Sequence, residues 1–231
     1  MTVKNTLQKK EEHSVKFMVG NDEVKLSPSI IRNYLVNGSG AVTDQEINYF
    51  IHLCRAQKLN PFVKEIYLIK YGTQPATFVV SKEAFLKRAE ANPQYDGSES
   101  GIIVIDKNGE IVNRKGGFYL KDTEQVVGGW AKVYRKDRKY PSEVEVTFDE
   151  YAGRKSDGTL NSNWSGKPAT MIKKVALVQA LREAFPNDLN NLYTEEEQGD
   201  IEVPYIPETP VEQPTEQKQE VVDVDYGESL V

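Results

Sequence analysis

The 231-residue sequence has one cysteine and only two histidines. Since a disulfide joins two cysteines, Cys54 cannot form one within the chain. Structural zinc sites usually take about four ligands drawn mainly from Cys and His, so a site of this kind is not expected. His13 and His52 both lie near the N-terminus, and no Ser-His-Asp or Cys-His arrangement is recognisable around them. The scarcity therefore argues against zinc sites and common nucleophilic hydrolases.

Long hydrophobic runs are also missing. No stretch approaches the roughly 18 consecutive apolar residues that a membrane-spanning helix needs. Residues 1–17 lack the apolar segment of a signal peptide. Hydrophobic residues make up 39% of the sequence and charged residues 28%, which is ordinary for a soluble globular protein. We therefore expect a cytoplasmic protein without a membrane partner.

Negative charge is concentrated at one end of the chain. From Thr194 onward there are twelve acidic residues and one lysine, whereas residues 1–193 carry a net charge of +5. The final segment also contains four prolines and little apolar periodicity, so it cannot bury enough surface to offset the entropy of ordering. We predict that residues 194–231 form a disordered acidic tail. Such a tail either serves solubility, binds a partner, or competes with nucleic acid for the basic body.

The remaining chain predicts an α+β fold, in which antiparallel β-hairpins form a small sheet packed with helices. We expect residues 1–40 to be a partly helical N-terminal segment and residues 41–193 to form one folded core. Thr43 and Glu46 make a capping box at the start of a helix. That helix places Cys54 on its apolar stripe, which indicates a core residue rather than a nucleophile.

Paired strands are expected before and after residue 100. The stretches FVKEIYLIKYG and ATFVV are typical of strands, and Ser81 caps a helix that ends near Pro93. From Gly101 the apolar period changes toward two, and Asn108-Gly109 is a turn signal, so a hairpin is predicted there. A second hairpin turns at residues 136–138. In its second strand, Val144, Val146 and Phe148 alternate with polar residues, so one face packs and the other is solvated.

The hairpin region is rich in positive charge. Residues 107–140 contain nine basic and four acidic residues, interleaved with five aromatic residues. This mixture suits a surface that follows a nucleic-acid backbone and stacks on bases. Lysines near hairpin tips also discourage aggregation between sheet edges, and this alternative stays open.

The stretch from Trp164 to Pro186 predicts a helix with clear limits. Pro168 suits the first turn, and Pro186 cannot continue the helix. On its surface, Lys174 and Arg182 share one flank two turns apart, while Lys173 points elsewhere. Two cations on one flank either bind phosphates or form ordinary solvated surface. The buried stripe is expected to contain Met171, Val175, Val178, Leu181 and Phe185, widened by Ala176, Leu177, Ala180 and Ala184.

Catalytic alternatives have weaker support in the sequence. Gly153 and Gly158 have the spacing of a phosphate-binding loop, but Thr159 stands where the loop requires lysine, so ATP hydrolysis is not predicted. Carboxylates such as Asp149 and Glu150 leave a magnesium-dependent nuclease as one alternative. A self-assembling scaffold that does not bind DNA is another.

Three stretches resemble a known family: LCRAQKLNPFVKEIYLIKYG, GGWAKVYRKD and WSGKPATMIKKVALVQALREAFPNDLNNLYTEEE. They are similar to the RecT/Bet (Redβ) family of phage single-strand annealing proteins, and above all to its RecT branch from phages of Gram-positive bacteria. The resemblance covers roughly residues 40–197. It is most specific in the last stretch, at Trp164, Pro168, Met171, Lys174, Ala176, Arg182, Ala184, Phe185, Pro186, Tyr193 and Glu196.

The resemblance implies a non-enzymatic DNA-binding protein. Members bind single-stranded DNA without ATP, assemble into homo-oligomeric rings or helical filaments, and pair complementary strands through an annealed duplex intermediate. They act beside a partner exonuclease, and a host single-strand-binding protein is a further expected partner. No cofactor is implied, although Mg²⁺ could modulate annealing. Such a task needs phosphate contacts rather than base readout, because a base edge held by protein cannot meet its complement.

We therefore expect the DNA backbone to lie in a groove on the 168–185 helix. Lys174 and Arg182, and with them Lys173, are the predicted groove residues, and the resemblance places Trp164 and Lys167 nearby. Trp164 either stacks on DNA or belongs to the core. Charge alone adds five further candidates, which are Arg154, Lys155, Lys115, Arg135 and Lys132.

Removal of the acidic tail should strengthen DNA binding. If the tail competes with DNA for the basic body, a chain that ends near Tyr193 should bind single-stranded oligonucleotides more tightly at low salt. A titration of labelled oligonucleotide with the full and shortened chains measures this. Equal affinities would indicate that the tail docks a partner instead.

Overall fold

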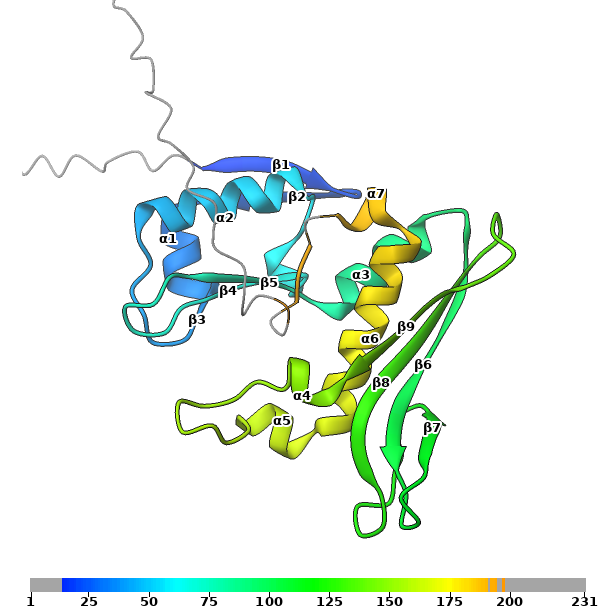
Figure 1. The fold of residues 1–231 in the computed structure, drawn as a ribbon. Helices are drawn as coiled ribbons and strands as arrows, with labels where there is room; N and C mark the ends of the chain where they lie inside the picture. Colours follow the sequence, from blue (N-terminus) through cyan, green and yellow to red (C-terminus); the bar gives the residue numbers. More distant parts are fainter. Residues whose placement is uncertain (1–13, 191, 195–196, 198–231) are drawn as a thin grey trace, which may run out of the picture. The chain divides into compact units, whose positions relative to one another are not determined.

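The computed structural model describes residues 14–190, 192–194 and 197, and its strands form three separate sheets (Figure 1). The fold is α+β, as the apolar patterns predict. The predicted disorder of 195–196 and 198–231 lies outside the described residues. Thr194 and Glu197 correct the predicted start of the tail, because both are packed against the folded part.

The largest sheet has four antiparallel strands in the order β7-β6-β8-β9. The two predicted hairpins are confirmed, and pairing of β6 with β8 joins them into one sheet. The first strand begins well before Gly101, because its polar first half pairs with the end of β8 although it lacks an apolar alternation of its own. The strands are β6 (Tyr95–Ile105), β7 (Ile111–Lys115), β8 (Gln125–Arg135) and β9 (Ser142–Thr147).

Phe148 departs from the predicted strand. Val144 and Val146 are buried on one face of β9 as expected, but Phe148 begins the short helix α4 (Phe148–Tyr151). Its ring meets the Trp164 ring edge-on, with 5.2 Å between centroids. The aromatic contact packs the start of α4 against α5 (Ser162–Gly166).

The helix α6 (Pro168–Ala184) packs on one face of this sheet and is followed by α7 (Pro186–Leu189). The predicted helix limits are confirmed. Its buried surface is wider than the predicted stripe, since Ala169 and Ile172 are buried while Met171 is half-buried. The reason is that α6 contacts both the sheet and α3 (Lys82–Ala91), so apolar residues on more than one side are covered.

A glycine permits the close approach of α6 to the sheet. A Cβ on Gly129 of β8 would lie 2.7 Å from the backbone oxygen of Ile172 on α6. Any side chain at this position would therefore push helix and strand apart. Around this contact, one core contains residues of both elements, among them Ile102, Val133, Val144, Val175 and Val178.

A three-stranded sheet lies beside α3 and α2 (Asp44–Ala56). Its strands are β3 (Val36–Asn37), β4 (Ile66–Ile69) and β5 (Thr77–Val80), with β3 parallel and β5 antiparallel to β4. The capping box at Thr43 and the Ser81 cap of α3 are both present. Cys54 on α2 is fully buried, and burial raises the pKa of its thiol, which confirms a core residue.

The described part of the N-terminal segment combines strand and helix. A hairpin of β1 (Val15–Val19) and β2 (Asp22–Leu26) precedes α1 (Pro28–Ile30) and the π-helical turn η1 (Ile31–Leu35). The expected helical content is therefore present, whereas the hairpin was not expected. A 3-10 turn, η2 (Pro61–Val63), follows α2.

Substitution of Gly129 by alanine should destabilise the fold. The added methyl group would meet backbone atoms of Ile172, which cannot move without shifting α6, and overpacking of this kind costs about 1–3 kcal/mol. Urea unfolding measures the change. The control is Gly166→Ala at the end of α5, where no atom lies within 4 Å of the added carbon. Equal stability of the two variants would contradict the close contact.

Candidate nucleic-acid interface

A groove of about 670 Å³ lies between α6 and the three-stranded sheet. The floor and walls combine apolar residues of β4, β5 and α6 with basic side chains. Four lysines and one glutamate are among its lining residues. The glutamate, Glu83, pairs with Lys82 at 3.4 Å. Among the described lining residues, positive charges therefore outnumber negative ones. The lysines are Lys82, Lys167, Lys173 and Lys174.

Helix geometry explains which α6 residues reach the groove. Thr170, Lys174 and Leu177 recur at spacings of four and three, which places them on one face. Lys173 is about 100° away from Lys174 and lies at the margin of that face. The two adjacent lysines point in different directions, as predicted, and both still line the same groove.

A loop of the four-stranded sheet adjoins the groove. Gly116 donates its N–H to the backbone oxygen of Ser100, which lines the groove, at 2.9 Å. A Cβ on Gly117 would lie 3.8 Å from Nζ of Lys173. Gly117 therefore lies close to the ammonium group of Lys173.

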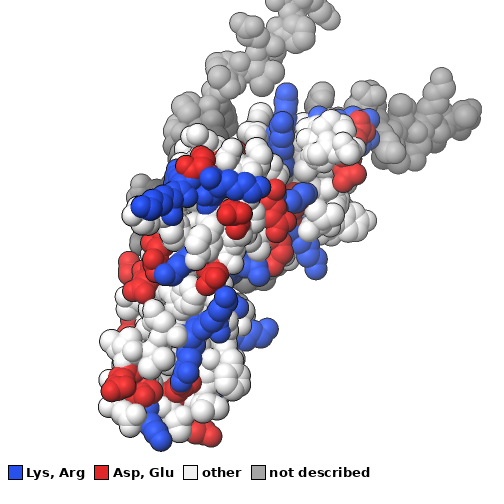
Figure 2. Space-filling model, turned by 90° about the vertical axis from the view of Figure 1, so that its right-hand side faces the viewer, with Lys and Arg blue, Asp and Glu red and all other residues white. Residues whose placement is uncertain are grey.

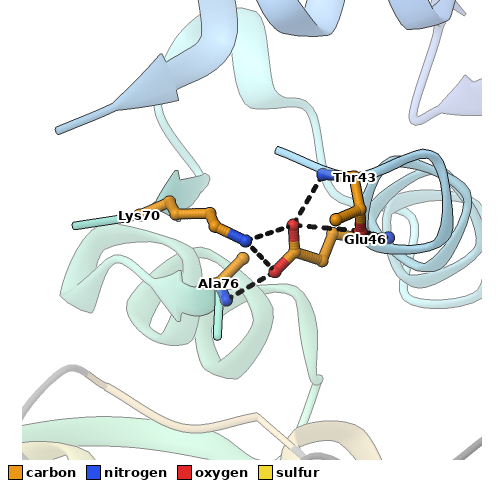
Figure 3. A network of polar contacts seen from close by, with 4 residues as sticks. All are labelled: Thr43, Glu46, Lys70 and Ala76. Carbon is orange, nitrogen blue, oxygen red and sulfur yellow. Dashed lines mark hydrogen bonds and ion pairs between the residues drawn. The ribbon is translucent and has the colours of Figure 1, made fainter. Parts of the chain in front are cut away.

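Glu46 holds the groove wall to α2 (Figure 3). Its carboxylate accepts hydrogen bonds from Nζ of Lys70 at 2.6 and 2.7 Å, from the N–H of Ala76 at 2.9 Å and from the N–H of Thr43 at 2.8 Å. Lys70 directly follows β4, and its N–H donates to the backbone oxygen of Asn37 at 2.8 Å. One carboxylate therefore connects the start of α2 with the residue that follows β4 and the residue that precedes β5.

The same contacts set the ionisation of Glu46. Burial acts to raise the pKa of this carboxyl, but the hydrogen bonds from Lys70 and from the amides of Thr43 and Ala76 together outweigh it. The pKa of Glu46 is consequently below its ordinary value. The carboxylate stays ionised and keeps its charge opposite Lys70, whose side chain is only 7% exposed.

Arg182 does not line the groove. Its Nη2 lies 2.8 and 2.7 Å from the two carboxylate oxygens of Glu197, and its guanidinium lies over the rings of Tyr193 and Phe85. It lies about two turns beyond Lys174 along α6, past the residues that line the groove. In this structure Arg182 is therefore paired with a carboxylate of the same chain.

Trp164 belongs to the core. Its side chain is 2% exposed, so neither face of the indole is open to a base. Asn161 caps α5 by accepting from the N–H of Trp164 at 3.1 Å, and Phe148 covers the ring edge-on. Of the two alternatives that the sequence left open, the structure supports the core residue.

Lys115 and Lys132 lie on the face of the large sheet that α6 does not cover. Lys132 pairs with Glu143 at 2.7 Å, and this hydrogen bond raises the pKa of Lys132. Lys115 pairs with Glu99 at 3.4 Å. Figure 2 shows this side of the molecule, where basic and acidic side chains are interspersed. The sheet face is therefore of mixed charge.

The remaining candidates lie apart from the groove. Arg135 donates to the backbone oxygen of Ala184 at 2.6 Å and pairs with Asp137 at 2.7 Å, so it caps the end of α6. Arg154 pairs with Asp149 at 3.1 Å, in the same exposed loop as Lys155. The structure thus brings together three of the ten predicted residues, which are Lys167, Lys173 and Lys174.

Sequence reasoning missed Lys82. It is the first residue of α3, directly after the Ser81 cap, and this helix start was recognised from the sequence. What could not be read was the proximity of this start to α6, because the two are more than eighty residues apart in the chain.

The described residues form neither a metal cluster nor a membrane span. No group of three or more His, Cys, Asp or Glu side chains is placed there to hold a metal ion. None of the helices in the same part of the chain combines the length and apolar character that a bilayer crossing needs.

Comparison with known proteins identifies relatives. The model of the RecT family matches residues 22–209. An uncharacterized protein of Ureaplasma parvum is 32% identical over 154 residues, which are 65% of this chain and 60% of that protein. The recombination protein bet of Escherichia phage lambda is 23% identical over 171 residues, 72% of this chain and 57% of that protein. The chain spans less than two thirds of the length of either relative.

Substitution of Glu46 by glutamine should destabilise the protein in a pH-dependent way. Glutamine leaves Lys70 buried without a countercharge, which we expect to cost about 2–3 kcal/mol at neutral pH, below the range for fully buried pairs. Because the pKa of Glu46 is lowered in the fold, its contribution is complete above the ordinary value of 4.5 and is lost as the pH falls through the folded value.

Unfolding by urea between neutral and acidic pH measures this difference. The gap between the original protein and Glu46→Gln should narrow as the pH falls. Glu90→Gln on the exposed side of α3 is the control and should leave stability nearly unchanged. A gap that stays constant down to low pH would contradict the assigned role of the carboxylate.

Proposed function

The chain belongs to the RecT family, and from that premise we propose that it binds single-stranded DNA and anneals complementary strands in phage-type recombination. The proposal includes that it acts without ATP and without catalysing a covalent step. The observation that carries it is the gathering of four lysines around one groove. The relationship to a recombination protein of phage lambda supports the same function.

The groove suits a sugar-phosphate backbone. Lysine offers a charge and hydrogen-bond donors to phosphate without reading a base, so the contacts do not depend on sequence. Leu177 and the half-buried Tyr67 and Ile69 supply apolar surface beside the lysines. A strand bound through its phosphates leaves the pairing edges of its bases free for a complementary strand.

Base pairing supplies the free energy for annealing. Stacked DNA base pairs contribute about 1.4 kcal/mol per step, so a protein that aligns two strands needs no nucleotide hydrolysis. Its contribution is to neutralise the phosphates that keep two strands apart, by displacing condensed counterions. This is consistent with Thr159 standing where an ATP-binding loop would need lysine.

We further propose that the protein acts as a homo-oligomer, in a ring or helical filament. Four lysines per subunit give modest affinity, and linkage of many sites along one strand multiplies it. An exonuclease that exposes single strands and a host single-strand-binding protein are the proposed partners, in the cytoplasm. Mg²⁺ would act by screening phosphates rather than as a bound cofactor.

Substitution of Lys174 by alanine should weaken binding to single-stranded DNA. The loss of one phosphate contact should lower affinity and flatten the plot of log affinity against log salt by about 0.7 to 1 unit. Fluorescence anisotropy of a labelled oligonucleotide, measured at several salt concentrations, gives both quantities. Lys173→Ala and Lys167→Ala should act in the same direction.

The matched control is Lys25→Ala, which removes an exposed lysine of β2 that does not line the groove. Its salt dependence should equal that of the unchanged protein. If Lys174→Ala folds normally and retains the original slope, the backbone does not lie in this groove. Shortening of the labelled strand in magnesium would indicate a nuclease instead.

A further inference from the structure

The ion pair between Arg182 and Glu197 joins α6 to the chain that follows α7. The Glu197 side chain is 7% exposed and the Arg182 side chain 24% exposed. The same carboxylate accepts hydrogen bonds from the N–H of Thr194 at 3.0 Å and from its hydroxyl at 3.1 Å. We refer to Arg182, Thr194 and Glu197 as the C-terminal latch.

Residues 192–194, which carry Thr194 of the latch, lie beside the end of β5. Leu192 and Thr194 are each 1% exposed, and the N–H of Val80 donates to the backbone oxygen of Tyr193 at 3.1 Å. Figure 1 shows this segment after α7 returning beside β5. Val80 lines the groove, so the segment passes directly next to the groove wall.

Arg182 continues the line of basic residues that leaves the groove. It lies eight residues after Lys174, which is about 12 Å along the helix axis and about 80° around it. Leu177, between them, lines the groove. A backbone that follows Lys167 and Lys174 along α6 would reach Arg182 next, if Glu197 were not there.

Glu197 accepts hydrogen bonds from only part of the Arg182 guanidinium. Both contacts come from the single nitrogen Nη2, whereas a fork-like pair uses two nitrogens. Nε of Arg182 is buried and has no hydrogen-bond partner among the described residues. A buried donor without a partner weakens the closed arrangement, because its desolvation is not compensated.

We propose that Glu197 occupies the place of a DNA phosphate and that a bound strand displaces it from Arg182. In the closed state the groove ends before Arg182. In the open state Arg182 adds one more phosphate contact to each subunit. This inference rests on the proposed function, and it specifies the regulation of the same site.

The competition is intramolecular and therefore effective. A carboxylate a few residues from the helix is present at a high effective concentration, so it holds Arg182 until several neighbouring phosphates arrive together. Short or isolated anions would then leave the latch closed, whereas a long strand anchored at Lys167 and Lys174 opens it.

Substitution of Glu197 by glutamine in the full chain tests the latch. Glutamine keeps the size and the bonds from Thr194 but removes the charge opposite Arg182. Affinity for a single-stranded oligonucleotide should rise about three- to tenfold near 50 mM salt, and the salt slope should steepen by about 0.7. Urea unfolding verifies that each variant is folded, and Glu197→Asp, which draws the charge away from Arg182, should show a smaller gain.

Two controls separate the latch from a general charge effect. Glu183→Gln removes the same charge from an exposed position next to Arg182 in the chain, and it should leave the affinity nearly unchanged. In an Arg182→Ala background, Glu197→Gln should give no gain, because no guanidinium remains to be released. Gains of equal size in Glu183→Gln, or in the Arg182→Ala background, would overturn the latch.

The outcomes also distinguish the latch from the function on which it rests. If Lys174→Ala weakens binding while Glu197→Gln and Glu197→Asp change nothing, the latch is wrong and the groove stands. If the unchanged protein does not bind single-stranded DNA at any salt concentration, both proposals fail.

Discussion

The close approach of α6 to β8 at Gly129 is the contact on which the candidate interface depends. It places α6 against the large sheet on one side and leaves another side to face β4, β5 and α3. Because α6 is buried on several sides, its few polar positions have fixed directions. Lys173 and Lys174 consequently line the groove, while Arg182 is directed to Glu197. The charged residues on α6 are positioned by apolar packing rather than by their own contacts.

Basic residues of this protein fall into two groups with different consequences. Those at the groove lie among apolar residues and beside one another, and Lys82 also pairs with Glu83. Several elsewhere are paired with carboxylates of the fold, as Lys132 is with Glu143 and Arg135 with Asp137. Net charge per segment therefore describes the interface poorly. What distinguishes the groove is that four lysines and one carboxylate, Glu83, are found among its described lining residues.

Local features were predictable from sequence because each depends on a few neighbouring residues. The capping box of Thr43 and Glu46, both hairpins and the limits of α6 were read correctly. Long-range contacts were not predictable. The pairing of Arg182 with Glu197 needs the chain to turn back after α7, and the role of Lys82 needs α3 to lie beside α6. The partners of basic residues on the sheet were not predictable either. Glu143 lies opposite Lys132 only because of the register between β8 and β9.

The central claim is that groove lysines hold phosphates while leaving bases free to pair. The most direct measurement compares the rate at which complementary oligonucleotides anneal, without ATP, in the presence of the unchanged protein and of a variant with Lys167, Lys173 and Lys174 all replaced by alanine. The account predicts acceleration well above the spontaneous rate by the unchanged protein and a rate near the spontaneous one for the folded variant. Equal acceleration by both proteins, or none by either, would contradict it.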